Sequence, residues 1–336
     1  MELWVWILGW YLCILTMVMN GFVIFLVCRK RQLRTKTNTF IVSLAVADFC
    51  VGMIAAPSRL LCKMVDECIS DKEIRLLIYY VWGFFIYASG SNLLVLVFER
   101  YIAVVKPLKY LTFMKRSRVI QMVLTSWGVP FIFILTLLSI SLNSIDHWMT
   151  IIGYLHLLFE VILCVTLIFC LVSMFLVVYK QNTRDRTLAR QLHFNQRVAK
   201  VKTQNTSAVK WLAFVTCMFL LCYGILMRCS FLILTGHECG NDIYYKVPLQ
   251  VVNSGINPIV YAFFKRDIKQ ECKRLLFKRR RGAFLLREVL VRLDFYETVP
   301  SGPLVAVVSF ILCHCFTSET VFVMLSFTCD TLSSAS

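Results

Sequence analysis

Two asparagines and a proline lie within one apolar stretch late in the chain, Asn253-Ser254-Gly255-Ile256-Asn257-Pro258-Ile259-Val260-Tyr261. Such residues are costly in lipid, so a membrane helix keeps them where they face protein or water. An earlier apolar stretch carries Asp48. An ionised aspartate at the centre of a membrane helix costs about 2.5–3.5 kcal/mol on insertion scales. These residues therefore predict a polar cluster that faces the protein interior.

We expect the partners of Asp48 to be polar residues of other apolar stretches. The candidates are Asn20, Ser89, Asn253, Ser254 and Asn257. Carboxylate, hydroxyl and amide oxygens are the ligands that a hard cation prefers. Hydrogen bonds that only hold helices together, contributing about 0.6 kcal/mol each, would explain any single residue. The set as a whole favours a functional cluster.

A charged pair follows the third apolar stretch, in Glu99-Arg100-Tyr101. The glutamate can hold the guanidinium in a local ion pair until a partner arrives. Exposed pairs contribute only about 0–1 kcal/mol, which suits a switch. Charged side chains that reach from a helix end into water would explain the pair alone. The adjoining segment 102–108, with Pro107, makes the switch the better interpretation.

Seven apolar runs must position these residues. With 59% hydrophobic residues among 336, the chain is too apolar for a soluble protein of this size. Each run is long enough to cross a bilayer, which takes about 20 residues. We expect spans at about 4–28, 39–62, 75–105, 118–142, 148–181, 206–234 and 243–264. The predicted fold class is an all-α integral membrane bundle of seven helices, with residues 1–264 as one domain.

The basic residues that give the net charge of +17 are unevenly distributed along the chain. Most of the 36 Lys and Arg residues fall in alternate connections, 29–38, 106–118, 180–210 and 265–292. Because cytoplasmic loops carry the positive excess, we expect an amino terminus outside the plasma membrane and a cytoplasmic carboxyl terminus. The basic loops would face inner-leaflet lipid and cytosolic partners, and we expect no nucleic-acid partner.

Two smaller features lie near the membrane faces. Apolar and basic residues recur at helical spacing over 265–278, which predicts an amphipathic eighth helix along the inner leaflet. Cys272 within it is a candidate for S-palmitoylation. Cys229 and Cys239 flank the last outer loop and are a candidate disulfide, although spacing alone does not establish the pairing.

Residues 279–336 are first basic and then apolar. Neither of their apolar runs reaches spanning length, so we expect a poorly ordered or membrane-associated tail.

Two other function classes were weighed against these features. An ion-coupled transporter or channel would use the Asp48 cluster as its ion site, but such folds usually show internal repeats or paired broken helices. Neither pattern occurs here, so this class is kept as the alternative. A membrane enzyme needs clustered His or acidic residues, and the five histidines are isolated from one another in the sequence. We therefore do not expect an enzyme.

In combination, the motifs resemble those of rhodopsin-like (class A) G-protein-coupled receptors over about residues 5–278. Asn20 resembles the helix-one asparagine of that family, and Leu44-Ala45-Val46-Ala47-Asp48 resembles its helix-two signature. Glu99-Arg100-Tyr101 is a variant of the family's Asp-Arg-Tyr. Trp127 stands at the helix-four tryptophan, and Asn257-Pro258-Ile259-Val260-Tyr261 matches the helix-seven motif in full.

The resemblance implies a receptor that passes an extracellular signal to a heterotrimeric G protein. It implies no cofactor beyond an allosteric sodium ion, held by Asp48, Ser89, Asn253, Ser254 and Asn257. The implied activation switch consists of Asn20, Glu99, Arg100, Tyr101, Tyr179, Phe219, Tyr223, Pro258 and Tyr261. The implied G-protein contacts are Arg100, Pro107 and Leu108.

The chain also departs from the family pattern. Arg75 stands in place of the cysteine at the outer end of helix three, and Leu171 in place of the helix-five proline. These two losses are weakly similar to the melanocortin, cannabinoid and lysophospholipid receptors. Cys222-Tyr223-Gly224-Ile225 replaces Cys-Trp-x-Pro, where Gly224 can loosen the helix. Asn205 stands near the glutamate that latches helix six, so we expect raised basal activity.

The ligand is constrained mainly by exclusion. Trp82 stands where amine receptors carry an aspartate, and Val251 where opsins carry the retinal lysine. The predicted pocket consists of Trp82, Ile86, Leu163, Leu226, Met227 and Val247, with Arg59 and Glu160 at its outer rim. This wall predicts an apolar small molecule, a lipid or a short peptide, although helix packing explains each wall residue equally well.

Overall fold

The computed structural model describes residues 3–62, 68, 70–143, 147–189, 196–237, 242–265, 267–272 and 274. Within these ranges all regular elements are helical. The chain forms two units, Met1–Lys265 and Arg266–Ser336, each of which is described by itself.

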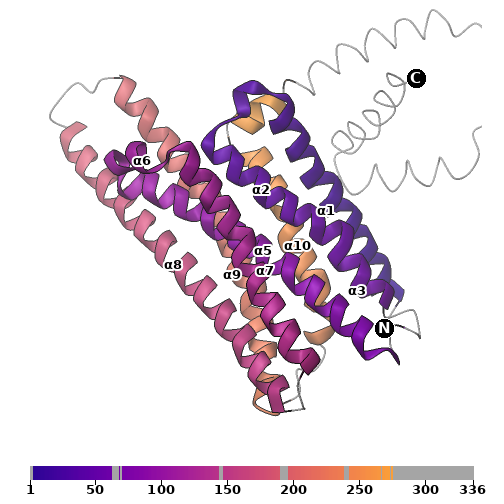
Figure 1. The fold of residues 1–336 in the computed structure, drawn as a ribbon. Coiled ribbons are helices and arrows are strands. Elements are labelled where there is room, and N and C mark those ends of the chain that lie inside the picture. The colour runs from indigo at the N-terminus through magenta and orange to yellow at the C-terminus, as the bar shows by residue number, and fades with distance from the viewer. Residues whose placement is uncertain are drawn as a thin grey trace, which may run out of the picture. The chain divides into compact units, whose positions relative to one another are not determined.

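The first unit is a helical bundle (Figure 1). Its α-helices in the described ranges are α1 (Leu3–Arg29), α2 (Lys36–Cys50), α3 (Ala56–Cys62), α5 (Lys72–Val105), α6 (Pro107–Phe113), α7 (Arg116–Asn143), α8 (His147–Ala189), α9 (Gln196–Leu234) and α10 (Asp242–Phe264). Two short segments have other helical pitches, the 3-10 turn η1 (Arg31–Leu33) and the π-helical turn η2 (Val51–Ala55). The predicted all-α membrane class is confirmed.

Six spans in the described ranges are long and apolar enough to cross a membrane. Helix α10 is not among them, because Asn253, Asn257 and Pro258 make the predicted seventh span less apolar. α8 and α9 also run past the predicted spans 148–181 and 206–234. Hydropathy alone does not show these extensions, because a helix can continue in polar sequence after its apolar part ends.

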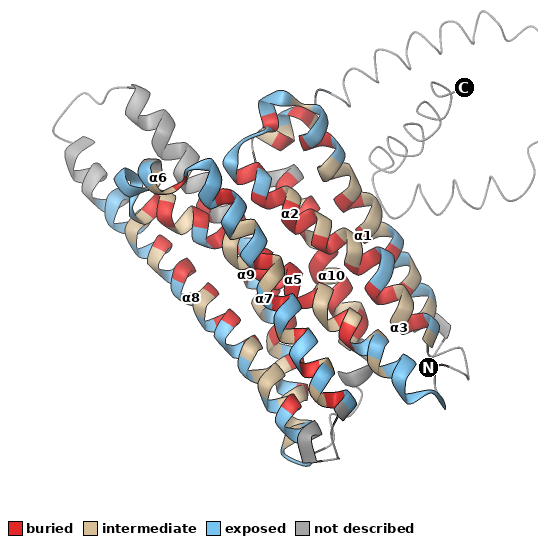
Figure 2. Cartoon of the chain, viewed as in Figure 1, coloured by how far each residue is buried: buried red, intermediate tan, exposed pale blue. Residues whose placement is uncertain are grey.

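Helix α5 is the centre of the bundle and lies against α2, α7, α8 and α9. Most of its buried side chains fall between Tyr80 and Val104, including Ser89 and Asn92. Outward-facing positions of α7 and α8 carry exposed apolar side chains such as Phe131 and Phe169. Figure 2 shows the buried positions turned toward the neighbouring helices. This pattern fits a bundle whose outer surface is solvated by lipid.

The second span is continuous but changes pitch. α2 passes through the wider π-helical turn η2 into α3. Pro57 follows that turn, and a proline ring lacks the N–H donor and crowds the carbonyl four residues earlier. A wider turn relieves such crowding and rotates the side chains that follow. Arg59, one turn on, packs over Tyr79 and Trp82 of α5, with its guanidinium carbon 5.6 Å and 5.9 Å from the ring centroids.

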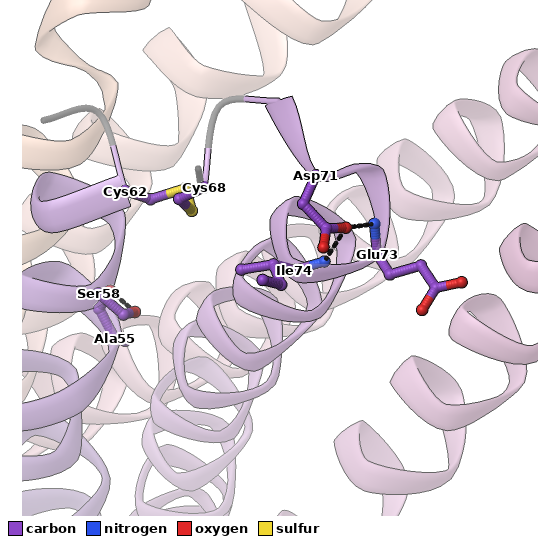
Figure 3. Close-up of a disulfide and its surroundings, with 7 residues drawn as sticks. All are labelled: Ala55, Ser58, Cys62, Cys68, Asp71, Glu73 and Ile74. Carbon is purple, nitrogen blue, oxygen red and sulfur yellow. Dashed lines mark hydrogen bonds between the residues drawn. A yellow bond between two sulfur atoms is a disulfide. The ribbon is translucent and has the colours of Figure 1, made fainter. Parts of the chain in front are cut away.

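A short cross-link joins the connection between α3 and α5. Cys62 and Cys68 form a disulfide with their Cα atoms 5.2 Å apart. Asp71 then caps α5, since its carboxylate accepts from the backbone N–H of Glu73 at 2.8 Å and of Ile74 at 3.3 Å (Figure 3). The start of α5 is therefore fixed by a cap and a local bridge.

The candidate bridge across the last outer loop is described at one end. Cys229 is buried and disulfide-bonded. Cys239 lies outside the described residues, so its pairing with Cys229 stays a prediction.

The second unit is described at residues 267–272 and 274, and residues 267–272 are helical. Arg274 pairs with Glu271 at 2.6 Å. Cys272 carries a free, half-buried thiol, and burial raises its pKa to about 11. The predicted amphipathic helix 265–278 is described in part, and the tail 279–336 lies outside the described residues.

Candidate functional site

The Asp48 carboxylate is fully buried and joins three helices. Ser89 of α5 donates its hydroxyl to Oδ1 at 2.6 Å, and Asn257 of α10 donates its amide to Oδ2 at 2.7 Å. The buried Ser254 hydroxyl adjoins the same carboxylate without a hydrogen bond of ordinary geometry. Asn253 is buried one turn before Asn257. The sequence-predicted partners thus lie in one cluster.

Helix α1 joins this cluster at a position where the backbone of α10 lacks one helical hydrogen bond. Pro258 has no N–H to donate to the carbonyl of Ser254, four residues earlier. Asn20 supplies the missing donor, with its amide nitrogen 3.2 Å from that carbonyl and 2.9 Å from the carbonyl of Thr16. Thr16 in turn donates its hydroxyl to the carbonyl of Val251 at 3.3 Å.

The cluster contains oxygen atoms that suit a hard cation. Among the described residues, the side-chain oxygens of Asn20 and Ser254 are buried without a hydrogen-bond partner. They accompany a carboxylate and the Ser89 hydroxyl, and such oxygens are the ligands that hard cations prefer. The residues therefore fit a sodium ion, whose presence stays a prediction.

A second cluster surrounds Glu99, whose side chain is fully buried at the other end of α5. Arg100 pairs with its carboxylate and also contacts the Thr37 hydroxyl. Thr37 and Tyr110 donate their hydroxyls to Oε1 of Glu99 at 3.2 Å and 2.7 Å. The carboxylate therefore has partners from α2, α5 and α6.

Tyr110 stays a hydrogen-bond donor in this cluster. Burial, and after it the nearby Glu99 carboxylate, raises the pKa of Tyr110 to about 12. The phenol therefore keeps its proton at physiological pH. Pro107 begins the same helix, α6. Leu108 follows it with an apolar side chain that is 87% exposed.

Aromatic contacts connect α9 to α5 and α10. Phe219 and Tyr223 stack with ring centroids 4.0 Å apart, and Tyr223 donates its hydroxyl to the carbonyl of Ile86 at 3.3 Å. The ring of Trp211 packs edge-on against the ring of Tyr261, with the ring centroids 5.5 Å apart. The buried Tyr261 hydroxyl has no partner in the described part of the chain.

Two other predicted switch residues lie on the helix surface. Tyr179 on α8 is 74% exposed, whereas Tyr261 is fully buried. Tyr101 is half-buried and stacks with Phe98 at 6.1 Å between ring centroids. In this conformation the structure does not bring Tyr179 into the buried cluster that contains Tyr261.

The predicted pocket residues are mostly buried. Trp82, Ile86, Leu163, Leu226 and Val247 are buried, and Met227 is half-buried. Glu160 was expected at the outer rim but is only 9% exposed. Its Oε1 accepts from Tyr87 at 3.4 Å, and the Tyr87 oxygen lies 2.8 Å from Nδ1 of His156.

Sequence reasoning missed several of these residues. Thr37, Tyr87, Tyr110, His156, Lys246 and Gln250 all contribute to the polar groups described here or below. The spacing of His156 to Glu160 and of Lys246 to Gln250, four residues each, would have placed each pair on one helix face. Hydroxyl residues at helix ends carry no comparable signal.

The Trp127 position also belongs to an internal network. Its indole donates to the Ser43 hydroxyl at 3.0 Å. Ser43 and Ser126 both donate to the amide oxygen of Asn92, at 2.6 Å and 2.9 Å. This network joins α2, α5 and α7 and is a packing element of the bundle.

Comparison with known proteins gives a consistent assignment. The family model described as 7 transmembrane receptor (rhodopsin family) matches residues 19–261. The neuropeptide S receptor of Mus musculus is 25% identical over 297 residues, which cover 79% of this chain and 77% of that receptor. The trace amine-associated receptor 1 of Macaca mulatta is 26% identical over 287 residues, covering 78% of this chain and 84% of that receptor.

A third relative matches over a shorter region. The cholecystokinin receptor type A of Canis lupus familiaris is 29% identical over 118 residues, covering 35% of this chain and 28% of that receptor. The expected likeness to melanocortin, cannabinoid and lysophospholipid receptors stays a prediction.

Proposed function

Because the chain belongs to the rhodopsin family of seven-transmembrane receptors, we propose that its Asp48 and Glu99 clusters form the two ends of one activation switch. The protein is a G-protein-coupled receptor of the plasma membrane that crosses it several times, and it is not an enzyme. The alternative of an ion-coupled transporter or channel is not supported.

The closed arrangement around Glu99 carries the proposal. Arg100 is held by the neighbouring carboxylate and by Thr37, and Tyr110 completes the set. A ligand can move a two-state equilibrium only through its different affinity for the two states. In the active state Arg100 would leave Glu99, and Arg100, Pro107 and Leu108 would contact the G protein.

The Asp48 cluster would oppose that change. A sodium ion held by Asp48, Ser89, Asn253, Ser254 and Asn257 would stabilise the inactive packing of α2, α5 and α10. Tyr261 lies beside Trp211, and no described residue pairs with its hydroxyl, so it is the residue best placed to rearrange with Pro258. Phe219 and Tyr223 would carry the movement of α9, and Tyr101 and Tyr179 would join at the cytoplasmic end.

Topology and lipid contacts follow from the charge pattern. The basic loops support an amino terminus outside and a carboxyl terminus in the cytoplasm. Residues 1–264 would be the receptor domain and 265–278 an amphipathic helix on anionic inner-leaflet lipid. Palmitoylation of Cys272 would add a second membrane anchor.

The ligand is proposed to be a short peptide or an amine-bearing small molecule. Two of the relatives are named for peptides, neuropeptide S and cholecystokinin, and a third for trace amines. The polar groups beside the apolar wall favour such a ligand over a lipid, because a lipid would leave them unpaired.

The test is nucleotide exchange by purified heterotrimeric G proteins of each class with the full-length receptor in lipid vesicles. Basal exchange by the wild type should exceed that of Arg100→Ala. Lys36→Ala is the matched control, because Lys36 is an exposed cation at the start of α2. Equal exchange by wild type and Arg100→Ala with every G-protein class would contradict the proposed coupling.

A further inference from the structure

Two side chains on α8 carry buried hydrogen-bonding atoms that no described residue satisfies. His156 and Glu160 are four residues apart and so share one helix face. Tyr87 contacts one atom of each, Nδ1 of His156 and Oε1 of Glu160. The other atoms, Nε2 of His156 and Oε2 of Glu160, are buried and have no partner among the described residues.

A matching pair lies on α10. Lys246 and Gln250 are also four residues apart, and Gln250 is 5% exposed. Its side-chain oxygen has no partner within the described ranges. Lys246 interacts electrostatically with Glu160 and with Arg59, so the two helix faces address one region of the bundle.

Arg59 supplies the second cation of this region. Its guanidinium lies over the rings of Tyr79 and Trp82. Cation–π contacts hold a guanidinium in place while its N–H groups stay able to bind an anion. The region therefore combines one carboxylate, two cations and an amide oxygen.

Buried polar atoms of this kind are destabilising unless something satisfies them. Burial without partners in several side chains at once points to a ligand that completes them. The carboxylate of Glu160 and the oxygen of Gln250 can accept from N–H donors, whereas Arg59 and Lys246 can donate to an anion. A ligand that carries both an ammonium and a carboxylate group would match both sets.

We propose that Arg59, His156, Glu160, Lys246 and Gln250 bind a zwitterionic ligand, a free amino acid or a short peptide with both termini free. The ammonium group pairs with Glu160 and Gln250, and the carboxylate pairs with Arg59 and Lys246. The apolar wall of Trp82, Ile86 and Leu163 takes the side chain. The carboxylate that receives the ammonium group thus lies on α8, while Trp82 occupies the α5 position where amine receptors carry an aspartate.

This inference rests on the proposed receptor function but can be tested apart from signalling. The probes are the twenty free L-amino acids and a panel of unmodified dipeptides, each with its N-acetylated and C-amidated counterpart. Binding is measured as the rise in unfolding temperature of the purified full-length receptor, since a ligand that binds only the folded state stabilises it. Signalling is measured separately as G-protein nucleotide exchange.

At least one unmodified probe should stabilise the wild type, and acetylating or amidating it should weaken binding about tenfold to a hundredfold. Losing one charge-assisted hydrogen bond has an effect of this order. Glu160→Gln should make the receptor indifferent to acetylation of the probe, and Lys246→Gln indifferent to its amidation. Glu73→Gln and Lys72→Gln, exposed at the start of α5, are the matched controls and should bind as the wild type does.

Four results would overturn the inference. No unmodified probe stabilises the wild type, the capped probes bind as well as the free ones, or Glu160→Gln and Lys246→Gln keep the wild-type preference. A probe whose binding depends only on its amine, and is unchanged in Lys246→Gln, also contradicts a zwitterionic ligand. If zwitterions bind but Arg100→Ala exchanges nucleotide as the wild type does, the proposed coupling fails and the site stands. If exchange responds to Arg100→Ala but no zwitterion binds, the reverse holds.

Discussion

Asn20 on α1 donates its amide to the carbonyl of Ser254 on α10, a carbonyl that Pro258 leaves without a helical donor. Another helix therefore supplies the hydrogen bond that the backbone of α10 lacks at this position. This relationship explains how a proline persists in a membrane helix, because the carbonyl that it leaves without a helical donor is satisfied inside the protein.

Replacing Asn20 by leucine should leave the Ser254 carbonyl buried and unpaired. We expect Asn20→Leu to lower the free energy of unfolding by about 1–3 kcal/mol, the usual cost of an unsatisfied buried group. Thermal unfolding of the purified receptor in one detergent measures the change. Thr136→Val on the exposed side of α7 is the control, because its hydroxyl bonds only within its own helix. Equal losses for both variants would contradict this role of Asn20.

Asp48→Asn should abolish the effect of sodium on basal signalling. The wild type should show at least about fivefold less basal exchange in sodium than in potassium at equal ionic strength, a typical allosteric coupling. The variant loses the carboxylate charge while an amide keeps the hydrogen-bonding shape, so the two salts should give equal rates. Glu73→Gln removes an exposed acid and should keep the sodium response. A sodium response that survives in Asp48→Asn argues against the ion site.

The Asp48 cluster could be anticipated because polar residues in an apolar stretch are conspicuous and expensive. Asp48, Ser89 and Asn257 are each rare in their surroundings, and the structure joins them directly. The helix boundaries of the first, third and fourth spans were predictable for a similar reason, since charge marks their ends.

Other features could not be read from the chain. Tyr110 and Thr37 reach Glu99 only because α6 folds back and α2 begins nearby, which depends on tertiary packing. The burial of Glu160 and its contact with Tyr87 also depend on how α8 packs against α5. The Cys62–Cys68 bridge was not predicted, because sequence spacing alone does not establish a pairing.

Tyr110→Phe should raise basal nucleotide exchange by about twofold to tenfold. The variant removes one hydrogen bond to Glu99, a bond of a kind that contributes about 0.5–1.5 kcal/mol, and so weakens the arrangement that holds Arg100. Tyr154→Phe, on the exposed side of α8, is the control. Unchanged exchange in Tyr110→Phe would show that the phenol does not restrain Arg100.

The same phenol gives a pH dependence with a defined sign. Its pKa is raised from 10.0 to about 12, so the folded state binds the proton more tightly than the unfolded state. The stability it contributes is fully present below about pH 10 and is lost as the pH rises through about 12. Ultraviolet titration of wild type against Tyr110→Phe should show one phenol fewer ionising near pH 12, and no difference there would contradict the assignment.

Gly52 in the wide turn η2 should not tolerate a methyl group. A Cβ there would lie 2.9 Å from the backbone oxygen of Cys13 on α1. We expect Gly52→Ala to cost about 1–3 kcal/mol in unfolding free energy, as overpacking usually does. Gly128→Ala on α7 is the matched control, since no atom lies within 4 Å of its Cβ. That control should stabilise by about 0.5–1 kcal/mol, because alanine favours a helix interior. Equal effects of the two variants in thermal unfolding would refute the close contact between η2 and α1.

The bridge between Cys62 and Cys68 should stabilise the outer end of the bundle modestly. Closing a loop of sequence separation 6 lowers the conformational entropy of the unfolded chain. In the chain-entropy description this stabilises the folded state by about 2 kcal/mol. We expect Cys62→Ser with Cys68→Ser to lower the unfolding temperature, and a reducing agent to bring the wild type toward the variant. Cys28→Ser with Cys217→Ser is the control, because both thiols are exposed and free.

The bridge also precedes Asp71, the cap of α5, so the double serine variant should loosen the Arg59 contact with Tyr79 and Trp82. Hydrogen exchange at the start of α5 should therefore rise in that variant and stay unchanged in the control, and equal exchange in both would show that the cap holds α5 without the bridge.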